Sequence, residues 1–335
     1  MTSRRGTDIT RAVEVLRGGG LVAFPTETVY GLGADAASND ATAKIFAVKG
    51  RPRAHPLIVH LATPELDGWA RDIPDAARKL AHAFWPGPLT IIVRKGPRVA
   101  DATTGGADTV GLRVPAHPMA LELLRAFGGG VAAPSANRFG AVSPTTADHV
   151  ETDLGDDVDY ILDGGACDVG VESTIVDLSR GHAVLLRPGG LAREEIERVI
   201  GPLASADASA PAAPGTLASH YAPRAKVIAA SVVDVPAQIA MVRRRALAAG
   251  EEVRVAVLAP AAAFALWPAE ALAHTEQRAL PDDVAGMARE LYAALRDLDA
   301  SGVDVVIAAL PPAVGLGEAV GDRLLRAAGP RGNDQ

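Results

Sequence analysis

The order of apolar and polar positions over the first 200 residues alternates between helical and extended patterns. In residues 7–17 apolar side chains recur on one helical face, and three glycines end the pattern. An apolar run over 21–24 stops at a proline, which predicts a short buried strand. The same analysis predicts helices over 41–48, 74–84 and 119–127, and strands over 57–61, 89–93, 109–114, 131–133, 160–162, 174–178 and 183–186. Because helices separate only some of these strands, we expect an α/β fold with a mixed, not purely parallel, sheet.

The pattern changes near residue 202. Residues 202–214 combine Ala and Ser with three prolines and show no apolar periodicity, which is typical of a linker. Beyond it the chain predicts strands over 227–233, 253–258 and 303–308, and helices over 235–249, 283–298 and 318–328. We therefore expect a domain over 1–201, a linker over 202–223, and a small Rossmann-like α/β domain over 224–330 with parallel connections.

Composition and charge narrow the function classes. The 335 residues are 48% hydrophobic and 22% charged, as in soluble globular proteins. Thirty-three Lys and Arg against 40 Asp and Glu give a net charge of -7, so a bound polyphosphate would need a local cluster of cations. The sequence shows neither an apolar membrane-spanning run nor a signal-peptide pattern, and we expect a cytoplasmic protein. The single cysteine, Cys167, is expected to be a small buried side chain.

Familiar catalytic and nucleotide-binding motifs do not account for the chain. The Gly-rich run over 31–36 fits a dinucleotide pattern by its letters, but it does not directly follow the predicted strand. Cations at Arg51 and Arg53 stand where an acidic ribose ligand is expected. The pair Gly315 and Gly317 is better explained as a tight turn into a helix. There is no Walker A sequence, no Gly-x-Ser-x-Gly elbow and no metal-binding histidine spacing.

Polar and cationic side chains instead gather at the ends of the predicted strands. They are Thr26, Glu27, Thr28 and Tyr30, then Lys49, Arg51 and Arg53, then His60, Arg113, Ser135, Asn137, Ser143, Glu172, Ser173 and Arg187. Ligands of open α/β sheets bind beyond strand ends, so these loops are expected to converge on one pocket. Four of the cations, Lys49, Arg51, Arg113 and Arg187, would then hold a triphosphate.

Each of these features alone has a simpler explanation. Lys49 and Arg51 fit a solvated helix end, and Ser135 and Asn137 fit a turn. His60 fits a hydrogen-bonded histidine at a strand end. An arginine in an apolar strand is costly unless it meets an anion, and for Arg113 that anion could be a carboxylate such as Asp35. Only the joint occurrence of these residues favours a site.

Together the motifs resemble the L-threonylcarbamoyladenylate synthase family. The resemblance rests on the run Phe24–Gly33, the Lys49-x-Arg51 pair, Pro56–His60 and Ser135-x-Asn137, and implies a YrdC-like fold for the first domain. In the tail, His220-Tyr221-Ala222-Pro223 and the run from Gly315 to Leu324 are similar to the two-domain branch of the family. The resemblance covers nearly the whole chain.

The resemblance implies an activity that joins L-threonine, bicarbonate or CO2, and ATP. The products are L-threonylcarbamoyladenylate and pyrophosphate, which makes the protein a nucleotidyltransferase. Partner proteins then transfer the threonylcarbamoyl group to the adenosine beside the anticodon of tRNA, and direct contact with tRNA is left open. Mg²⁺ would accompany ATP, with no metal site belonging to the protein itself.

The resemblance also implies roles for individual residues. The threonine site would comprise Thr28, His60, Arg113 and Ser173, and Lys49 and Arg51 would carry the catalytic charge. The ATP site would comprise Lys49, Arg51, His55, Thr109, Ser135, Asn137, Ser143 and Arg187. Two positions depart from the family pattern: His55 stands where Asn is frequent, and Leu217 where Lys is frequent.

Two other functions remain to be compared with this one. An enzyme of the same fold could use carbamoyl phosphate, and the first domain could be a double-stranded RNA or ribosome-binding module. The tail argues against the first, and the net charge of -7 against the second. We also expect the linker to cover the nucleotide pocket when ATP and threonine are bound, with His220 and Tyr221 anchoring its far end.

Overall fold

The computed structural model describes residues 4–207, 209–216 and 220–330. The chain divides into two compact units, one formed by Met1–Phe139 and Ser143–Thr216, the other by Gly140–Val142 and Leu217–Gln335. Every predicted site residue from Thr28 to Arg187 lies in the first unit, whereas Leu217 lies outside the described residues. Within the described ranges no helix is long and apolar enough to cross a membrane.

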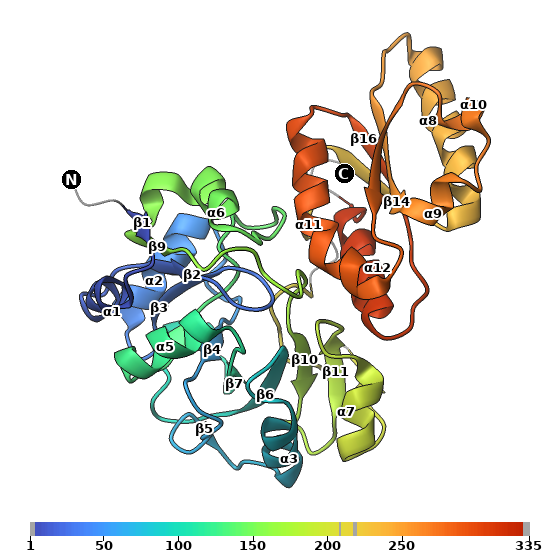
Figure 1. Ribbon diagram of the computed structural model, residues 1–335. Coiled ribbons are helices and arrows are strands. Elements are labelled where there is room, and N and C mark those ends of the chain that lie inside the picture. The colour runs from blue at the N-terminus through green and yellow to red at the C-terminus, as the bar shows by residue number, and fades with distance from the viewer. Residues whose placement is uncertain (1–3, 208, 217–219, 331–335) are drawn as a thin grey trace. The chain divides into compact units, whose positions relative to one another are not determined.

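The first unit is built on a mixed sheet of 12 described strands (Figure 1). The strands are β1 (Arg5–Gly6), β2 (Val22–Phe24), β3 (Gly31–Asp35), β4 (Ile58–His60), β5 (Ala70–Arg71), β6 (Leu89–Lys95), β7 (Thr109–Arg113), β8 (Val131–Ala132), β9 (Tyr160–Leu162), β10 (Thr174–Asp177), β11 (Val184–Arg187) and β12 (Ala204–Ser205). Their order is β1-β9-β2-β3-β8-β4-β7-β6-β10-β11-β12, with β5 beside β6. The pairs β4–β7 and β6–β10 are parallel and β6–β7 is antiparallel, so the predicted mixed α/β sheet is confirmed.

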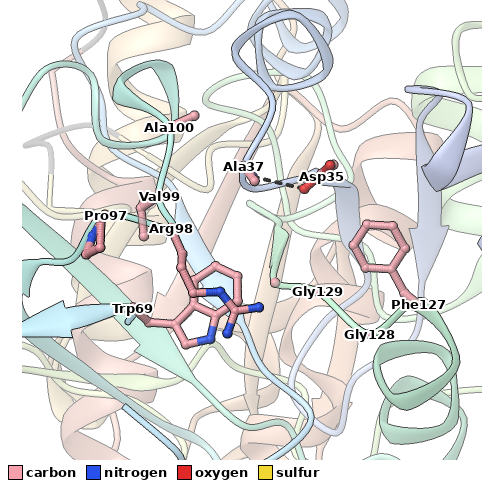
Figure 2. A pocket seen from close by; sticks show the side chains of 11 residues that line it. Asp35, Ala37, Trp69, Pro97, Arg98, Val99, Ala100, Phe127, Gly128 and Gly129 are labelled. Carbon is pink, nitrogen blue, oxygen red and sulfur yellow. Dashed lines mark hydrogen bonds between the residues drawn. The ribbon is translucent and has the colours of Figure 1, made fainter. Parts of the chain in front are cut away.

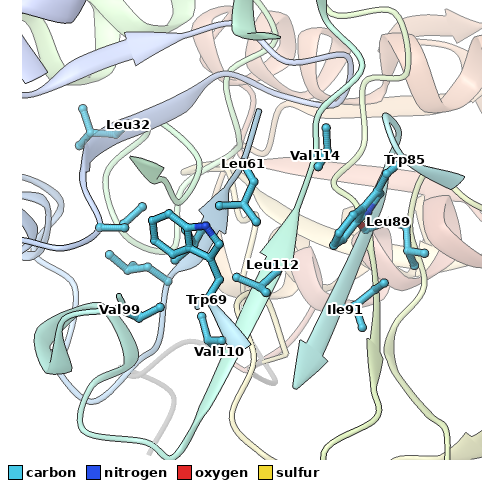
Figure 3. Close-up of a cluster of buried hydrophobic side chains, with 14 of the residues drawn as sticks. Leu32, Leu61, Trp69, Trp85, Leu89, Ile91, Val99, Val110, Leu112 and Val114 are labelled. Carbon is cyan, nitrogen blue, oxygen red and sulfur yellow. The ribbon is translucent and has the colours of Figure 1, made fainter. Parts of the chain in front are cut away.

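Helices pack against this sheet and complete its core. They are α1 (Ile9–Arg17), α2 (Asn39–Lys49), α3 (Asp75–Phe84), α4 (Asp101–Thr104), α5 (Pro118–Phe127), α6 (Ala147–Leu154) and α7 (Arg193–Ile200), with a 3-10 turn at Gly155–Asp157. Alternate strand residues such as Val110, Leu112 and Ile91 point into one core, together with Trp69 and Trp85 (Figure 3). The intervening strand residues face the opposite side, which leaves them available to form a site.

Strand β3 was missed by the sequence analysis, which took its glycine-rich letters for a failed nucleotide motif. It pairs antiparallel with β2 and β8. The glycine at Gly33 is required by packing, because a Cβ there would lie 2.8 Å from both the Phe24 ring and a Val131 methyl. The missing side chain therefore reflects a close approach between strands.

The segment predicted as an unpacked linker joins the first unit in part. Strand β12 pairs in parallel with β11, and Ala213 is buried among Ile58, Ile92 and Ile175. Small residues suit this position because they fit against the sheet without displacing its side chains. The segment thus packs more closely than its Ala, Ser and Pro composition suggested.

The second unit contains a four-stranded parallel sheet in the order β13-β16-β14-β15. Its elements are β13 (Lys226–Ala230), α8 (Val235–Ala249), β14 (Val255–Pro260), α9 (Ala261–Phe264), α10 (Ala269–Leu272), β15 (Thr275–Leu280), α11 (Val284–Ala300), β16 (Val305–Ala309) and α12 (Leu316–Ala327), with a 3-10 turn at Val232–Asp234. The predicted parallel connections are confirmed. The edge strand β15 was missed because its residues, TEQRAL, are mostly polar and exposed.

Candidate functional site

The site is built on one face of β4, β7, β6 and β10. In β4, Ile58 lies opposite Gly111 and His60 lies opposite Arg113 in the parallel register with β7. In β6, Thr90 lies opposite Ile175 of β10. These residues alternate with those of the core, so the face carries the polar side chains at the strand ends.

Arg113 ends β7 and meets a carboxylate. The residue is 3% exposed, and its Nη2 lies 2.8 Å from Oε1 of Glu27. The two atoms are close but are not aligned as a hydrogen bond. The Arg113 Nε donates to the carbonyl of Gly87 at 3.3 Å. The alternative of a carboxylate partner for Arg113 is thus confirmed, but that carboxylate is Glu27. The example given, Asp35, accepts the backbone N–H of Ala37 on its Oδ1 at 2.9 Å.

His60 is neutral at physiological pH. Burial, reinforced by the positive charge of Arg113, lowers the pKa of His60 to about 3. Its ring meets Phe24 edge-on, with centroids 5.8 Å apart. A neutral imidazole offers both a donor and an acceptor, so His60 can orient a polar ligand without adding charge.

Two hydroxyl pairs complete this half of the site. Thr28 is fully buried, and its Oγ1 lies 2.8 Å from that of Thr26, which in turn donates to the carbonyl of Val29 at 2.6 Å. Ser173 Oγ lies 2.8 Å from Thr90 Oγ1. Thr28 and Ser173 were both predicted, whereas Thr90 was missed although it occupies an inward position of the predicted strand.

Lys49 lies at the end of α2, where Gly50 in the left-handed conformation (φ 64°) turns the chain away. The ammonium donates to the carbonyl of Ser135 at 2.6 Å and to that of Asn137. Burial, with the neighbouring charge of Arg51, holds the pKa of Lys49 well below its usual value. Three residues predicted to share a nucleotide are thereby brought together.

Arg51 and His55 occupy the loop that follows α2. Arg51 donates from Nη2 to the carbonyl of Pro56 at 3.0 Å and from Nε to that of His55 at 3.4 Å. Its guanidinium carbon lies 5.6 Å from the centroid of the Phe139 ring, and the His55 ring meets the same ring edge-on. Partial burial and Arg51 lower the pKa of His55.

Arg187 ends β11 and links the site to the segment that follows α7. It donates to the carbonyl of Ser173 from both Nε (3.1 Å) and Nη2 (2.8 Å), and from Nη1 to the carbonyl of Pro214 at 2.9 Å. Ser143 Oγ donates to Glu172 Oε1 at 2.6 Å, one residue before Ser173. Sequence analysis assigned no contact to Pro214 or Glu172, because both contacts join segments distant in the chain.

Thr109 begins β7 and lines a small cavity under the linker segment. Pro56, Thr90 and Pro214 line it too, and its volume of about 10 Å³ leaves room for at most about one water molecule. The cavity therefore has no room for a larger ligand with Pro214 in this position. Thr109 therefore lies near Pro56 and Pro214, and its predicted contact with ATP stays a prediction.

The four cations of the predicted cluster bond to different partners, and the cluster itself stays a prediction. Lys49 and Arg51 bond to carbonyls of nearby loops, Arg187 bonds to Ser173, and Arg113 faces Glu27. The sequence analysis listed Glu27 at a strand end but did not identify it as the ion-pair partner of Arg113. Its position next to Thr28, a predicted site residue, could have indicated that it lies in the site.

A second cavity, of about 420 Å³, lies elsewhere in the first unit (Figure 2). Trp69, Arg98, Phe127 and Asp35 line it, and the Arg98 guanidinium carbon sits 4.2 Å from the Trp69 ring centroid. None of the predicted site residues lines this cavity.

Cys167 offers no activated nucleophile. Its side chain is buried, and burial raises the pKa of its thiol. The prediction of a small buried side chain is confirmed.

Comparison with known proteins identifies relatives along the whole chain. Residues 14–189 match a family model described as "Telomere recombination", and residues 191–329 match one described as "Threonylcarbamoyl-AMP synthase, C-terminal domain". The threonylcarbamoyl-AMP synthase of Pyrococcus abyssi is 45% identical, covering 96% of this chain and 94% of its own. That of Bacillus subtilis is 41% identical, covering 98% and 95%.

A solved structure agrees with the fold. The crystal structure of P. abyssi Sua5 complexed with L-threonine superposes with a TM-score of 0.87 at 41% identity, covering 97% of this chain and 96% of that chain. The agreement in sequence and structure extends over both units. The chain belongs to the two-domain threonylcarbamoyl-AMP synthase family.

Proposed function

We propose that the protein synthesises threonylcarbamoyl-AMP from L-threonine, bicarbonate or CO2, and ATP, and releases pyrophosphate. Full-length relatives carry that name, and a relative was crystallised with L-threonine. The observation that carries the proposal is the buried Arg113 at a strand end beside neutral His60.

The threonine half comprises Thr28, His60, Arg113 and Ser173. Arg113 binds the substrate carboxylate, because its fixed planar fork suits two carboxylate oxygens. The neutral imidazole and the two hydroxyl groups bind the remaining polar groups of the substrate. The supporting geometry is the common strand face on which His60 and Arg113 lie opposite each other.

The nucleotide half holds the phosphates with cations. Lys49 and Arg51 stabilise the charge that develops on the leaving pyrophosphate, and both now bond to carbonyl oxygens that phosphate oxygens can replace. The other assigned residues bind the rest of ATP: His55, Thr109, Ser135, Asn137, Ser143 and Arg187. A buried ammonium with a lowered pKa gains most from an anionic partner, which supports the role of Lys49.

The reaction is a nucleotidyl transfer that needs no protein nucleophile. The neutral threonine amine adds to CO2 and releases a proton, giving a carbamate. A carbamate oxygen then forms a bond to the α-phosphorus as the bond to pyrophosphate breaks. The protein contributes positioning and charge stabilisation, as is usual for transfers at phosphorus.

Mg²⁺ is proposed to accompany ATP, coordinated by phosphate oxygens and water. In the described ranges no group of three or more His, Cys, Asp or Glu side chains is arranged to hold a metal ion. The product is proposed to pass to proteins that transfer the threonylcarbamoyl group to tRNA.

The proposal is tested by incubating the protein with ATP, bicarbonate and a panel of amino acids. Mass spectrometry should detect pyrophosphate and L-threonylcarbamoyladenylate when the amino acid supplied is threonine, and neither product with the other amino acids. Turnover of carbamoyl phosphate without threonine-dependent pyrophosphate would establish the related carbamoyl-handling activity instead.

A further inference from the structure

Two oppositely charged atoms at the candidate threonine site meet no hydrogen-bond partner within the described residues. They are Oε1 of Glu27 and Nη2 of Arg113, 2.8 Å apart, in side chains that are more than 90% buried. Buried polar atoms are normally paired, so a donor and an acceptor left side by side indicate a ligand that supplies both partners.

The surroundings of Glu27 fix its carboxylate. Its Oε2 accepts the backbone N–H of Ala116 at 3.0 Å, and its own carbonyl accepts that of Val169 at 2.7 Å. Only Oε1 is left to meet a ligand. A positively charged group placed near Arg113 would therefore find a single, oriented acceptor.

An α-amino acid has the matching charges. The ligand's carboxylate and ammonium groups are attached to one carbon and so lie close together. The Arg113 guanidinium and the Glu27 carboxylate are adjacent in the same way, with the opposite charges. The buried ion pair is neutral and so is the zwitterion, so binding leaves no net charge uncompensated in the buried site. An arginine alone would accept any carboxylate.

We infer that Glu27 binds the α-amino nitrogen of the substrate while Arg113 binds its carboxylate. Glu27 thereby selects amino acids over carboxylic acids that carry the hydroxyl group but lack the amine. The inference rests on the proposed function, which makes threonine the substrate. The nitrogen carries an N–H as ammonium, as amine and as carbamate. Glu27 can therefore hold it through carbamate formation.

The alternative is that Glu27 merely orients Arg113, and a ligand pair separates the two roles. The ligands are L-threonine and 3-hydroxybutanoate, which keeps the carboxylate, hydroxyl and methyl groups but lacks the amine. Ligand-observed NMR titration gives both dissociation constants for the wild type, Glu27→Gln and Glu27→Asp. Asp168→Asn, which removes an exposed carboxylate close by, is the control.

Glu27→Gln should weaken threonine binding roughly 10- to 100-fold, as loss of a charged hydrogen-bond partner does. Binding of 3-hydroxybutanoate should stay unchanged or improve. Glu27→Asp retains the charge on a side chain that is shorter by one methylene group, so it should weaken threonine binding selectively but by a smaller factor. This variant provides the test if Glu27→Gln does not fold. Asp168→Asn should bind both ligands as the wild type does.

Equal weakening of both ligands would overturn the inference and leave Glu27 as a residue that orients Arg113. Unchanged threonine binding in both Glu27 variants would overturn it as well. A wild type that binds threonine in a Glu27-dependent way but makes no adenylate would overturn the proposed function and support the inference. A wild type that binds no threonine would overturn both.

Discussion

The two halves of the candidate site differ in how their buried charges are satisfied. On the proposed threonine side, Glu27 Oε1 and Arg113 Nη2 form an ion pair at 2.8 Å, but neither atom makes a hydrogen bond within the described residues. On the nucleotide side, Lys49 already donates to two carbonyl groups. If the proposed function holds, the first half offers unbonded atoms to its ligand, whereas the second would exchange protein carbonyls for phosphate oxygens.

This difference indicates where binding requires movement. Threonine bound as proposed would break no protein hydrogen bond of Arg113 Nη2 or Glu27 Oε1, although it would separate their ion pair. ATP bound as proposed would displace the contacts that Lys49 and Arg51 make with the carbonyl groups of Ser135 and Pro56. The predictions below test each half separately.

The largest effect is expected for Arg113→Ala. Losing one partner of a buried charge pair costs on the order of 2–5 kcal/mol, which is a fall in threonine affinity of roughly 30- to several thousand-fold. Calorimetry measures the affinity, and circular dichroism checks that the variant folds. The matched control is Arg94→Ala on the neighbouring strand, whose side chain is half-exposed. Unchanged threonine affinity in Arg113→Ala would refute the assignment.

Lys49→Ala and Arg51→Ala should reduce turnover about 10²- to 10³-fold at saturating ATP, the usual loss for one donor to developing charge. Threonine affinity should stay within about twofold, because the two halves use different partners. Steady-state pyrophosphate release measures turnover. Lys44→Ala, an exposed lysine on the same helix, is the control. If a variant keeps near-native turnover, the altered residue does not act on the phosphates and is only a cation at the end of the helix.

The buried His60 should make stability depend on pH. Its folded pKa of about 3 lies below the usual 6.5, so the unfolded chain binds more protons between these values. Stability is therefore lost as pH falls below 6.5, by about 1–2 kcal/mol between pH 6.5 and 5. Urea unfolding of the wild type and His60→Gln gives this difference; parallel curves for the two proteins would contradict it.

The smallest effect is expected at the linker. If ATP and threonine bind a form in which residues 204–216 cover the pocket, elastase cleavage there should slow about tenfold at ligand concentrations ten times Kd. Peptide mapping locates the cuts. Equal rates with and without both substrates, and full activity of a chain ending at Gly201, would leave the segment as a passive tether.

Most of the fold was predicted from the spacing of apolar residues, because the buried face of a helix or strand produces a regular spacing whichever element it packs against. It failed at β3, where close packing replaces side chains by glycine, and at β15, where an edge strand exposes polar residues. Both failures have a tertiary cause that a local pattern does not contain.

The contacts among the candidate residues were predictable only in part. Lys49, Ser135 and Asn137 could be grouped from the motifs, and they do meet. The partner of Arg113 was not predictable, because Glu27 lies 86 positions earlier on a loop whose path depends on β2 and β3. Strand register decides such contacts.

The glycine at Gly33 has a consequence for how this family can vary. A methyl group there would press on Phe24, whose ring in turn meets His60 edge-on. A substitution in the interior could thus change the choice of amino acid without altering any residue that contacts it. Relatives with a different substrate preference would then be expected to differ at two core positions together: a smaller side chain in place of Phe24 would make room for a side chain in place of Gly33.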